Sequence, residues 1–327
     1  MDLDPDRLRA MWWEKQFRLF KEEVDSTLTT LSDTPVLLKM ATESLAQYTD
    51  EAAISNKTTR PWPLLPLVVS ETISNRYRHV IPVAAALQFL RAAADIIDDI
   101  EDADSPKSLS NKYGPDLAIN LATALIFLSE TAITRLKKTN VENGTILLVM
   151  DKIYSYHISA CSGQHADLTL TLDSAISEEE YLEVVRMKSA FQVECACHVS
   201  AWLATPDKEL IDLLTRFGQS VGMAVQLAND IQGITRGRDI LKKKITLPVI
   251  YTLTHEDNDV SNQLRSQYSR LSEPTSDVTQ IKNLLFRCGA IHYVTVKLEM
   301  YKQQALDVLL NLENEGYDVE RLMLFLN

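Results

Sequence analysis

An almost uncharged segment that ends in a cluster of acids constrains the fold of this chain most. Residues 82–97 are mostly apolar, and Asp98-Asp99-Ile100-Glu101-Asp102 follows them directly. Apolar residues cover most faces of the helix that this segment would form, so we expect the helix to be buried. Burying an unpaired carboxylate is costly, so the acids at its end need a neutralising partner. The pattern predicts a core helix over 82–103 that carries Asp98 and Asp102 on one face.

A second polar cluster lies far along the chain. Asn229-Asp230-Ile231-Gln232-Gly233 follows the apolar residues 223–228. Two apolar helices with oxygen ligands that face each other would bind hard divalent cations, and magnesium suits such ligands. We therefore expect a magnesium site that holds a diphosphate. The alternatives are a solvated acidic helix end at 98–102 and a hydrogen-bonded core asparagine at Asn229.

Composition favours a helical protein and excludes several classes of function. Only 9 glycines and 11 prolines occur in 327 residues, of which 46% are hydrophobic, so we expect one all-α domain over 1–327. The net charge of -12 makes nucleic acid an improbable partner. The four cysteines form no CxxC pair, which favours a reducing, cytoplasmic location. No signal peptide or membrane span is expected.

Periodicity predicts most of the helices. A capping box is expected where Glu180 follows Ser177, and the polar residues 255–278 are expected to form a loop. The expected helices cover residues 5–31, 34–49, a segment from about 62, 82–103, 116–138, 143–161, 177–204, 208–235, 246–254, 279–313 and 317–326.

Six motifs in order resemble those of the trans-isoprenyl diphosphate synthase superfamily, from about residue 57 to 255. They are Asp98-Asp99-Ile100-Glu101-Asp102, Tyr113-Gly114 with Ala118-Ile119, Gly163-Gln164 with Asp167-Leu168, Lys188-Ser189, Gln226 with Asn229-Asp230, and Asp239 with Lys244 and Thr246-Leu247-Pro248.

The resemblance implies an all-α, class I isoprenoid or terpenoid synthase bundle around a central apolar cavity, with Mg²⁺ ions (three of them) at its mouth. It implies metal binding by Asp98, Asp99, Asp102 and Asn229. It implies diphosphate binding by Lys57, Arg60, Lys188, Gln226 and Lys244, with catalytic roles for Asp98, Asp102, Lys188 and Lys244. The side chains expected along the cavity are Phe89, Ala94, Tyr156, Gln164 and Phe191.

The chain also departs from the family pattern. In the basic segment that elongating members use for isopentenyl diphosphate, Lys57 and Arg60 remain but Thr58 replaces an arginine. The segment after the first acid motif offers Lys107 and no arginine, and lysine is not an equal substitute for bidentate arginine. Gly233 stands where the second motif has its last aspartate. Asp230, Asp239 or water could complete the shell of the third ion.

These departures lead to three functional hypotheses. The preferred one is a class I terpene cyclase, a lyase that ionises a linear prenyl diphosphate such as farnesyl diphosphate and closes a ring. The alternative is a prenyltransferase, either an elongating polyprenyl diphosphate synthase or a relative that prenylates a peptide. The third is a non-catalytic subunit, which retention of Asp98 and Asp102 disfavours. Relatives commonly form dimers, so a homodimer is expected.

Overall fold

The computed structural model describes residues 5–49, 61–74, 77–102, 107–255, 258–271 and 275–326, and these are helical with no strand among them. The first half contains seven α-helices in these ranges: α1 Pro5–Leu28, α2 Pro35–Thr49, α4 Leu65–Ile73, α5 Ile81–Asp102, α6 Leu109–Tyr113, α7 Pro115–Thr134 and α8 Asn143–Thr169. The second half contains α9 Glu178–Val185, α10 Phe191–Ala204, α11 Lys208–Arg236, α12 Arg238–Leu241, α13 Leu247–His255, α14 Asn258–Arg270, α15 Thr275–Arg287 and α16 Ala290–Asn314. The all-α prediction is confirmed.

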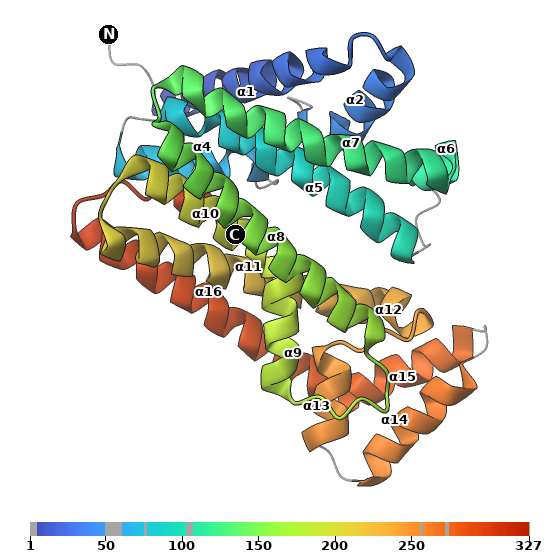
Figure 1. Ribbon diagram of the computed structural model, residues 1–327. Helices are drawn as coiled ribbons and strands as arrows, with labels where there is room; N and C mark the ends of the chain where they lie inside the picture. The colour runs from blue at the N-terminus through green and yellow to red at the C-terminus, as the bar shows by residue number, and fades with distance from the viewer. Residues whose placement is uncertain are drawn as a thin grey trace.

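The helix α5 lies in the core, as its apolar sequence predicts. It packs along α7, while α11 packs against α10 and α16 (Figure 1). Its residues from Pro82 to Ile96 include eleven that are buried, whereas Arg91, Ile97 and Asp98 are exposed. The C-terminal end of α5 lies on the same side of the molecule as the short α12 (Figure 1).

Among the residues that the structure describes, two helices are long and apolar enough to cross a membrane by length and composition alone. They run from Tyr77 to Asp102 and from Pro115 to Thr139, and 72% and 44% of their apolar windows are buried. A core helix of a globular protein passes the same test, so this is weak evidence for a span.

The boundaries differ from the prediction mainly in the C-terminal third. The polar segment 255–278 was expected to be a loop, but α14 occupies most of it because Leu264 and Tyr268, one turn apart, are buried. The helix expected over 279–313 is broken at Gly289, whose φ of 83° begins α16. Instead of a helix over 317–326, only a 3₁₀ turn (η6, Leu322–Phe325) forms.

The segment 177–204 forms one continuous helical segment that contains a π-helical turn. Ser177 accepts a hydrogen bond from the backbone N–H of Glu180, and the reciprocal bond completes the predicted capping box. The π-helical turn η5 (Arg186–Ala190) then separates α9 from α10. Such turns are rare and frequently mark functional sites, and this one carries Lys188.

Candidate active site

Asp98, Asp99, Glu101 and Asp102 form a cluster of carboxylates at the end of α5. Asp98 is exposed to solvent, and the side-chain amide of Gln164 on α8 donates to its Oδ1 at 3.3 Å. The same amide donates to Glu101 Oε2 at 2.5 Å. Gln164, which was expected along the apolar cavity, therefore lies at the acid motif instead.

Asp102 faces two lysines from the segment after α12. Lys242 Nζ and Lys244 Nζ lie 2.9 and 2.6 Å from its Oδ2. Burial raises the pKa of the Asp102 carboxyl, but the hydrogen bonds from both lysines outweigh it and hold the pKa below its usual value. Lys244 was predicted to be a site residue, whereas Lys242 was not. Two lysines from the second half of the chain thus neutralise Asp102.

The second cluster is buried more deeply than the first. Asn229 is exposed, but Asp230 is only 3% exposed. The Gln226 amide donates to Asp230 Oδ1 at 2.8 Å, and the Tyr181 hydroxyl donates to its Oδ2 at 3.2 Å. Burial raises the pKa of Asp230 to about 7, and the nearby charge of Asp239 contributes to the increase. Neutral donors, not a cation, therefore satisfy this carboxylate.

Asp239 occupies the space beside Gly233. A Cβ atom added at Gly233 would lie 1.8 Å from Asp239 Oδ2, so a side chain at position 233 and this carboxylate exclude each other. Asp239 is 4% exposed, and the Nε of Arg238 lies 3.2 Å from its Oδ1. The sequence showed that position 233 lacks the expected aspartate. It did not show that the Asp239 carboxylate lies against Gly233, because no local pattern predicts this contact.

Lys188 reaches the site from the π turn η5. Its ammonium pairs with Asp167 at the end of α8. Helix α8 and the π turn η5 approach closely at Gly163, where an added Cβ would lie 2.6 Å from the backbone nitrogen of Lys188. A glycine is therefore required at this crossing, which places Lys188 beside Gln226 and Asn229.

A small polar pocket lies at the second motif region. Its volume is about 70 Å³, and its lining includes Asp167, Lys188, Gln226, Asn229, Asp230, Asp239, Lys244 and Thr246. Lys244 joins this pocket to Asp102, so α5 and α11 share one cationic neighbour.

The remaining predicted cavity side chains lie in the core at different depths. Phe89 is fully buried and Phe191 is 4% exposed, whereas Ala94 is partly exposed. The hydroxyl of Tyr156 donates to Glu194 Oε1 at 3.1 Å and faces His198. The two predicted diphosphate contacts Lys57 and Arg60 lie outside the described residues.

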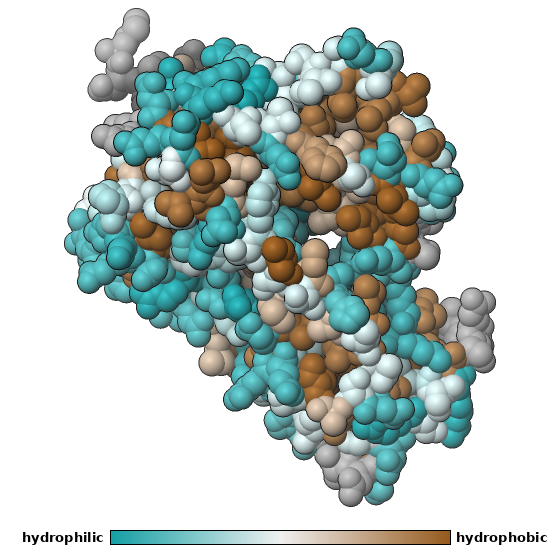
Figure 2. Space-filling view, viewed as in Figure 1, coloured by the Kyte–Doolittle hydropathy of each residue, from teal (hydrophilic) through white to brown (hydrophobic). Residues whose placement is uncertain are grey.

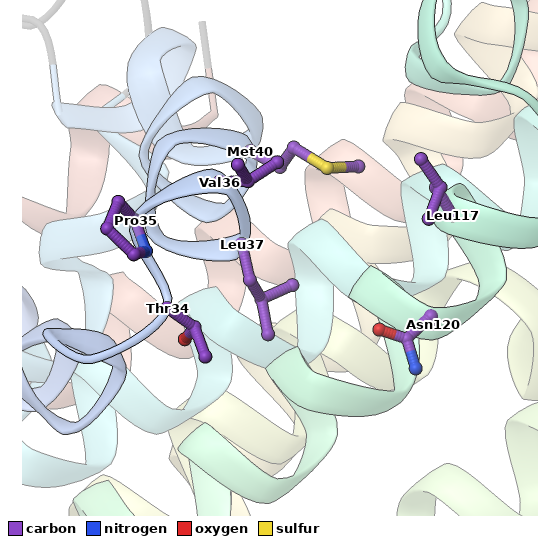
Figure 3. Close-up of a pocket in the computed structure, with 7 residues that line it drawn as sticks. All are labelled: Thr34, Pro35, Val36, Leu37, Met40, Leu117 and Asn120. Atoms are coloured by element: carbon purple, nitrogen blue, oxygen red, sulfur yellow. The ribbon is translucent and has the colours of Figure 1, made fainter.

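A second, larger pocket has no features suited to a diphosphate. It lies between the start of α2 and α7, has a volume of about 340 Å³, and is lined by the seven residues drawn in Figure 3. None of these is charged, so its chemistry differs from that of the polar pocket.

The donor set suits magnesium, although no finished metal site is present in the part of the chain that the structure describes. There, no three histidine, cysteine or acidic side chains converge on one point. Asp98 presents solvent-accessible carboxylate oxygens and Asn229 an exposed amide oxygen, which are hard ligands of the kind that magnesium accepts. Asp102 is held by lysines, which would have to give way to an ion.

Comparison with known proteins places this geometry in a family. Residues 42–285 match the family model described as polyprenyl synthetase. The tryptophan prenyltransferase ComQ of Bacillus spizizenii is 28% identical over 235 residues, covering 70% of this chain and 80% of that protein. The geranylgeranyl diphosphate synthase of Methanosarcina mazei is 26% identical over 246 residues, covering 71% and 73%.

The fold is also found among solved structures. Geranylgeranyl pyrophosphate synthetase from Pyrococcus horikoshii superposes with a TM-score of 0.82 at 21% identity, covering 98% of this chain and 97% of that one. The corresponding enzyme from Geoglobus acetivorans gives a TM-score of 0.78 at 22% identity, covering 96% of each chain. The predicted isoprenoid synthase bundle is confirmed.

The preference for a terpene cyclase was wrong. The relatives reported above are named as a prenyltransferase and as prenyl diphosphate synthases, and these names favour the alternative, prenyl transfer, over ring closure. The missing basic residues at Thr58 and in the segment 105–109 had suggested a cyclase, which needs no second diphosphate substrate. The family match covers most of the chain. The order of the motifs, the helical bundle and the pairing of Asp102 with lysines are consistent with that match. This chain is an enzyme of the polyprenyl synthetase family.

Proposed function

We propose that this chain is a magnesium-dependent prenyltransferase that ionises an allylic prenyl diphosphate, such as farnesyl diphosphate, and transfers the prenyl group to an indole ring of tryptophan. The observation that carries prenyl transfer is the meeting of Asp102 with Lys244 beside a pocket that also holds Lys188 and Asn229. Cationic and hard-oxygen groups converge there, as the departure of an anionic diphosphate requires.

The protein side chains have separable roles in this proposal. Lys188 and Lys244 bind diphosphate oxygens, and Gln226 lies beside them in the pocket. Asp98, Asp99 and Asp102 on α5 and Asn229 on α11 hold the metal ions, which we take to be three. Bound magnesium supplies Lewis-acid stabilisation of the leaving diphosphate. Transfer breaks the C1–O bond, forms a bond from C1 to an indole carbon, and releases diphosphate and one proton.

The choice of acceptor rests on the basic residues that the chain lacks. A second diphosphate would need its own cationic contacts, and Thr58 and the arginine-free segment 105–109 remove some of them. An indole is a neutral π nucleophile and needs no such site. The printed name of the Bacillus relative, a tryptophan prenyltransferase, points the same way.

Elongation with isopentenyl diphosphate is the second candidate. It is favoured by the retained Lys57 and Arg60 and by the geranylgeranyl diphosphate synthases among the relatives.

One assay separates these outcomes. The purified protein is incubated with Mg²⁺ and geranyl, farnesyl or geranylgeranyl diphosphate, together with a tryptophan-containing peptide, its phenylalanine analogue, or isopentenyl diphosphate. We expect a prenylated peptide only when tryptophan is present. A longer prenyl diphosphate, formed only with isopentenyl diphosphate, would instead establish elongation. Absence of transfer in every mixture would contradict prenyl transfer.

We also propose a cytoplasmic homodimer that forms through α7 and α8. The four cysteines are free, as expected in a reducing compartment. Both helices expose large apolar side chains, among them Leu117, Ile126, Phe127, Leu147, Leu148 and Ile158. Figure 2 shows hydrophobic side chains over the part of the surface where α7 lies. Phe127→Glu should halve the mass measured by light scattering, and an unchanged mass would contradict this interface.

A further inference from the structure

A histidine of α8 lies on the side of that helix that faces the acid motif. His157 and Gln164 are seven residues apart, which places them two turns apart on one side of α8, with Ala160 between them. The exposed Leu148 is on the opposite side. Because Gln164 donates a hydrogen bond to Asp98 of α5, His157 lies about 10 Å deeper along α8 than this contact.

Helices α5 and α10 meet α8 at the level of His157. The imidazole ring packs edge-to-face with Phe191 of α10, and the ring centroids are 5.1 Å apart. The next residue of α10, Gln192, accepts a hydrogen bond from Arg91, which precedes Asp98 by seven residues on α5. His157 and Arg91 therefore lie at a similar depth below the carboxylates, on two helices that both contact α10.

This level of the interior is open to solvent. The side chain of Arg91 is 48% exposed although most of α5 is buried, and Ala160 is partly exposed on the side of α8 that carries His157. The charge of Arg91 is balanced by Asp95, whose Oδ1 lies 2.7 Å from the arginine Nε. A neutral substrate group can therefore reach His157 without meeting an unpaired charge at Arg91.

The hydrogen bond of His157 determines which ring nitrogen is free. Its Nδ1 lies 2.8 Å from the carbonyl oxygen of Ile153, which can only accept, so Nδ1 carries the proton and Nε2 has the lone pair. Nε2 forms no hydrogen bond within the described part of the chain and is not shut off from solvent. Burial lowers the pKa of His157 below its ordinary value, although the bond to Ile153 opposes this, so the ring is neutral at pH 7.

We propose that His157 is the general base that takes the proton released when the prenyl group is transferred to the indole ring. This assignment rests on the proposed function. The C1–O bond breaks and diphosphate leaves with the electron pair, while a π pair of the indole forms the bond to C1 and the ring becomes cationic. Nε2 then accepts the proton that the ring loses, and the electrons of the broken bond restore a neutral product. The imidazolium releases this proton to solvent when the product leaves.

The leaving diphosphate is the competing proton acceptor. In the proposed site, Lys188, Lys244 and the metal ions neutralise its oxygens, and nearby cations make such an anion a weaker base. His157 has no cation among its hydrogen-bond partners in the described residues and lies deeper, on the side where the prenyl tail and its acceptor must meet. The imidazole is therefore the better base of the two.

The test separates proton removal from ionisation. His157→Asn has an amide that can keep the bond to Ile153 but has no basic nitrogen. With Mg²⁺, farnesyl diphosphate and the tryptophan-containing peptide, prenylated peptide should form about a hundredfold more slowly or worse. Diphosphate release should fall by less than about tenfold, because water captures the cation and prenyl alcohol accumulates. His165→Asn, which removes an exposed histidine of the same helix, should behave as the wild type.

Two outcomes would overturn the role of His157. An equal fall in peptide prenylation and in diphosphate release would show that the ring only supports binding or folding. Unchanged prenylation would assign the proton to the diphosphate. If circular dichroism shows that His157→Asn does not fold, His157→Gln, which also lacks a basic nitrogen, takes its place in the same comparison.

Failure of this inference can be distinguished from failure of the proposed function. Wild-type protein that releases diphosphate but prenylates no peptide would contradict the proposed function before any variant is made. Wild-type protein that prenylates the peptide, beside a His157→Asn variant that does so equally fast, would contradict only the role of His157.

Discussion

The two acidic clusters neutralise their charge in opposite ways. At the end of α5, Asp102 is paired with Lys242 and Lys244, and Asp98 remains open to solvent. On α11, burial raises the pKa of Asp230 to about 7, although the neutral groups of Gln226 and Tyr181 donate hydrogen bonds to it. The carboxylates of the first cluster are therefore paired with lysines or open to solvent, whereas the carboxylate of the second cluster is buried among neutral groups. Stability at the second cluster should depend far more on pH and on metal.

The largest expected effect comes from the open cluster. Asp98→Ala should lower prenyl transfer at least about a hundredfold, because it removes a carboxylate proposed to bind metal. The thermal midpoint should barely change, since Asp98 is exposed. Rates are measured by product formation, and Asp173→Ala, which removes a side chain that is 96% exposed, serves as the control. Normal transfer by the Asp98 variant would exclude Asp98 from the site.

The two clusters should respond to pH with opposite sign. The pKa of Asp230 is raised from 3.8 to about 7 by burial, so the native state keeps a proton that the unfolded chain releases above pH 4. In metal-free protein its contribution to stability therefore declines by roughly 2–4 kcal/mol between pH 4 and 7. The pKa of Asp102 is lowered, so its contribution is lost only as the pH falls below its ordinary value, about 4.

Urea unfolding at several pH values in the presence of a chelator measures this difference. Asp230→Asn should flatten the pH dependence between 4 and 7, whereas Asp102→Asn should change it only below that range. His198, whose pKa burial lowers to about 4, acts with the opposite sign in both proteins, so the difference between variant and wild type isolates Asp230. Parallel curves for Asp230→Asn and wild type would contradict the buried carboxylate.

A smaller effect is expected from one donor to Asp230. Tyr181→Phe removes the hydroxyl that donates to Asp230 Oδ2 and should lower the free energy of unfolding by about 1–2 kcal/mol in metal-free protein. Denaturant unfolding at pH 8 gives the value. A variant as stable as the wild type would show that the carboxylate is adequately hydrated and not dependent on this bond.

The smallest effect is expected at the lysines of the open cluster. Lys242→Met leaves Lys244 on Asp102, so unfolding free energy should change by less than about 1 kcal/mol. The same unfolding experiment measures it, beside Tyr181→Phe. A loss larger than that of Tyr181→Phe would reverse the contrast between the two clusters.

The sequence predicted what local pattern determines. The apolar run before Asp98 specified the core helix α5, and Ser177 with Glu180 specified the start of α9. The order of the motifs predicted that Lys188 and Lys244 are site residues, and in the structure both line one pocket. These features depend on residues close together in the chain or on a strong resemblance.

Features that depend on packing were not predicted. Lys242 pairs with Asp102, 140 positions away, and nothing in its own neighbourhood indicates this. The helix α14 has few apolar residues, so its composition resembled that of a loop, and the sequence did not show that Leu264 and Tyr268 would be buried in the core. Asp239 was one of three ways left open for the third ion, because filling the space at Gly233 is a tertiary contact.

Residues from Glu178 to Ala204 form one continuous helical segment in which the π turn η5 shifts the directions of the later side chains relative to the earlier ones. On the early side Tyr181 turns toward Asp230, and on the late side Cys195 turns into the core beside α5. Deleting one residue between 186 and 190 would rotate the later half by about 100° relative to the earlier one. The number of residues in this turn, as much as their identity, therefore determines that Lys188 and Tyr181 serve the same site.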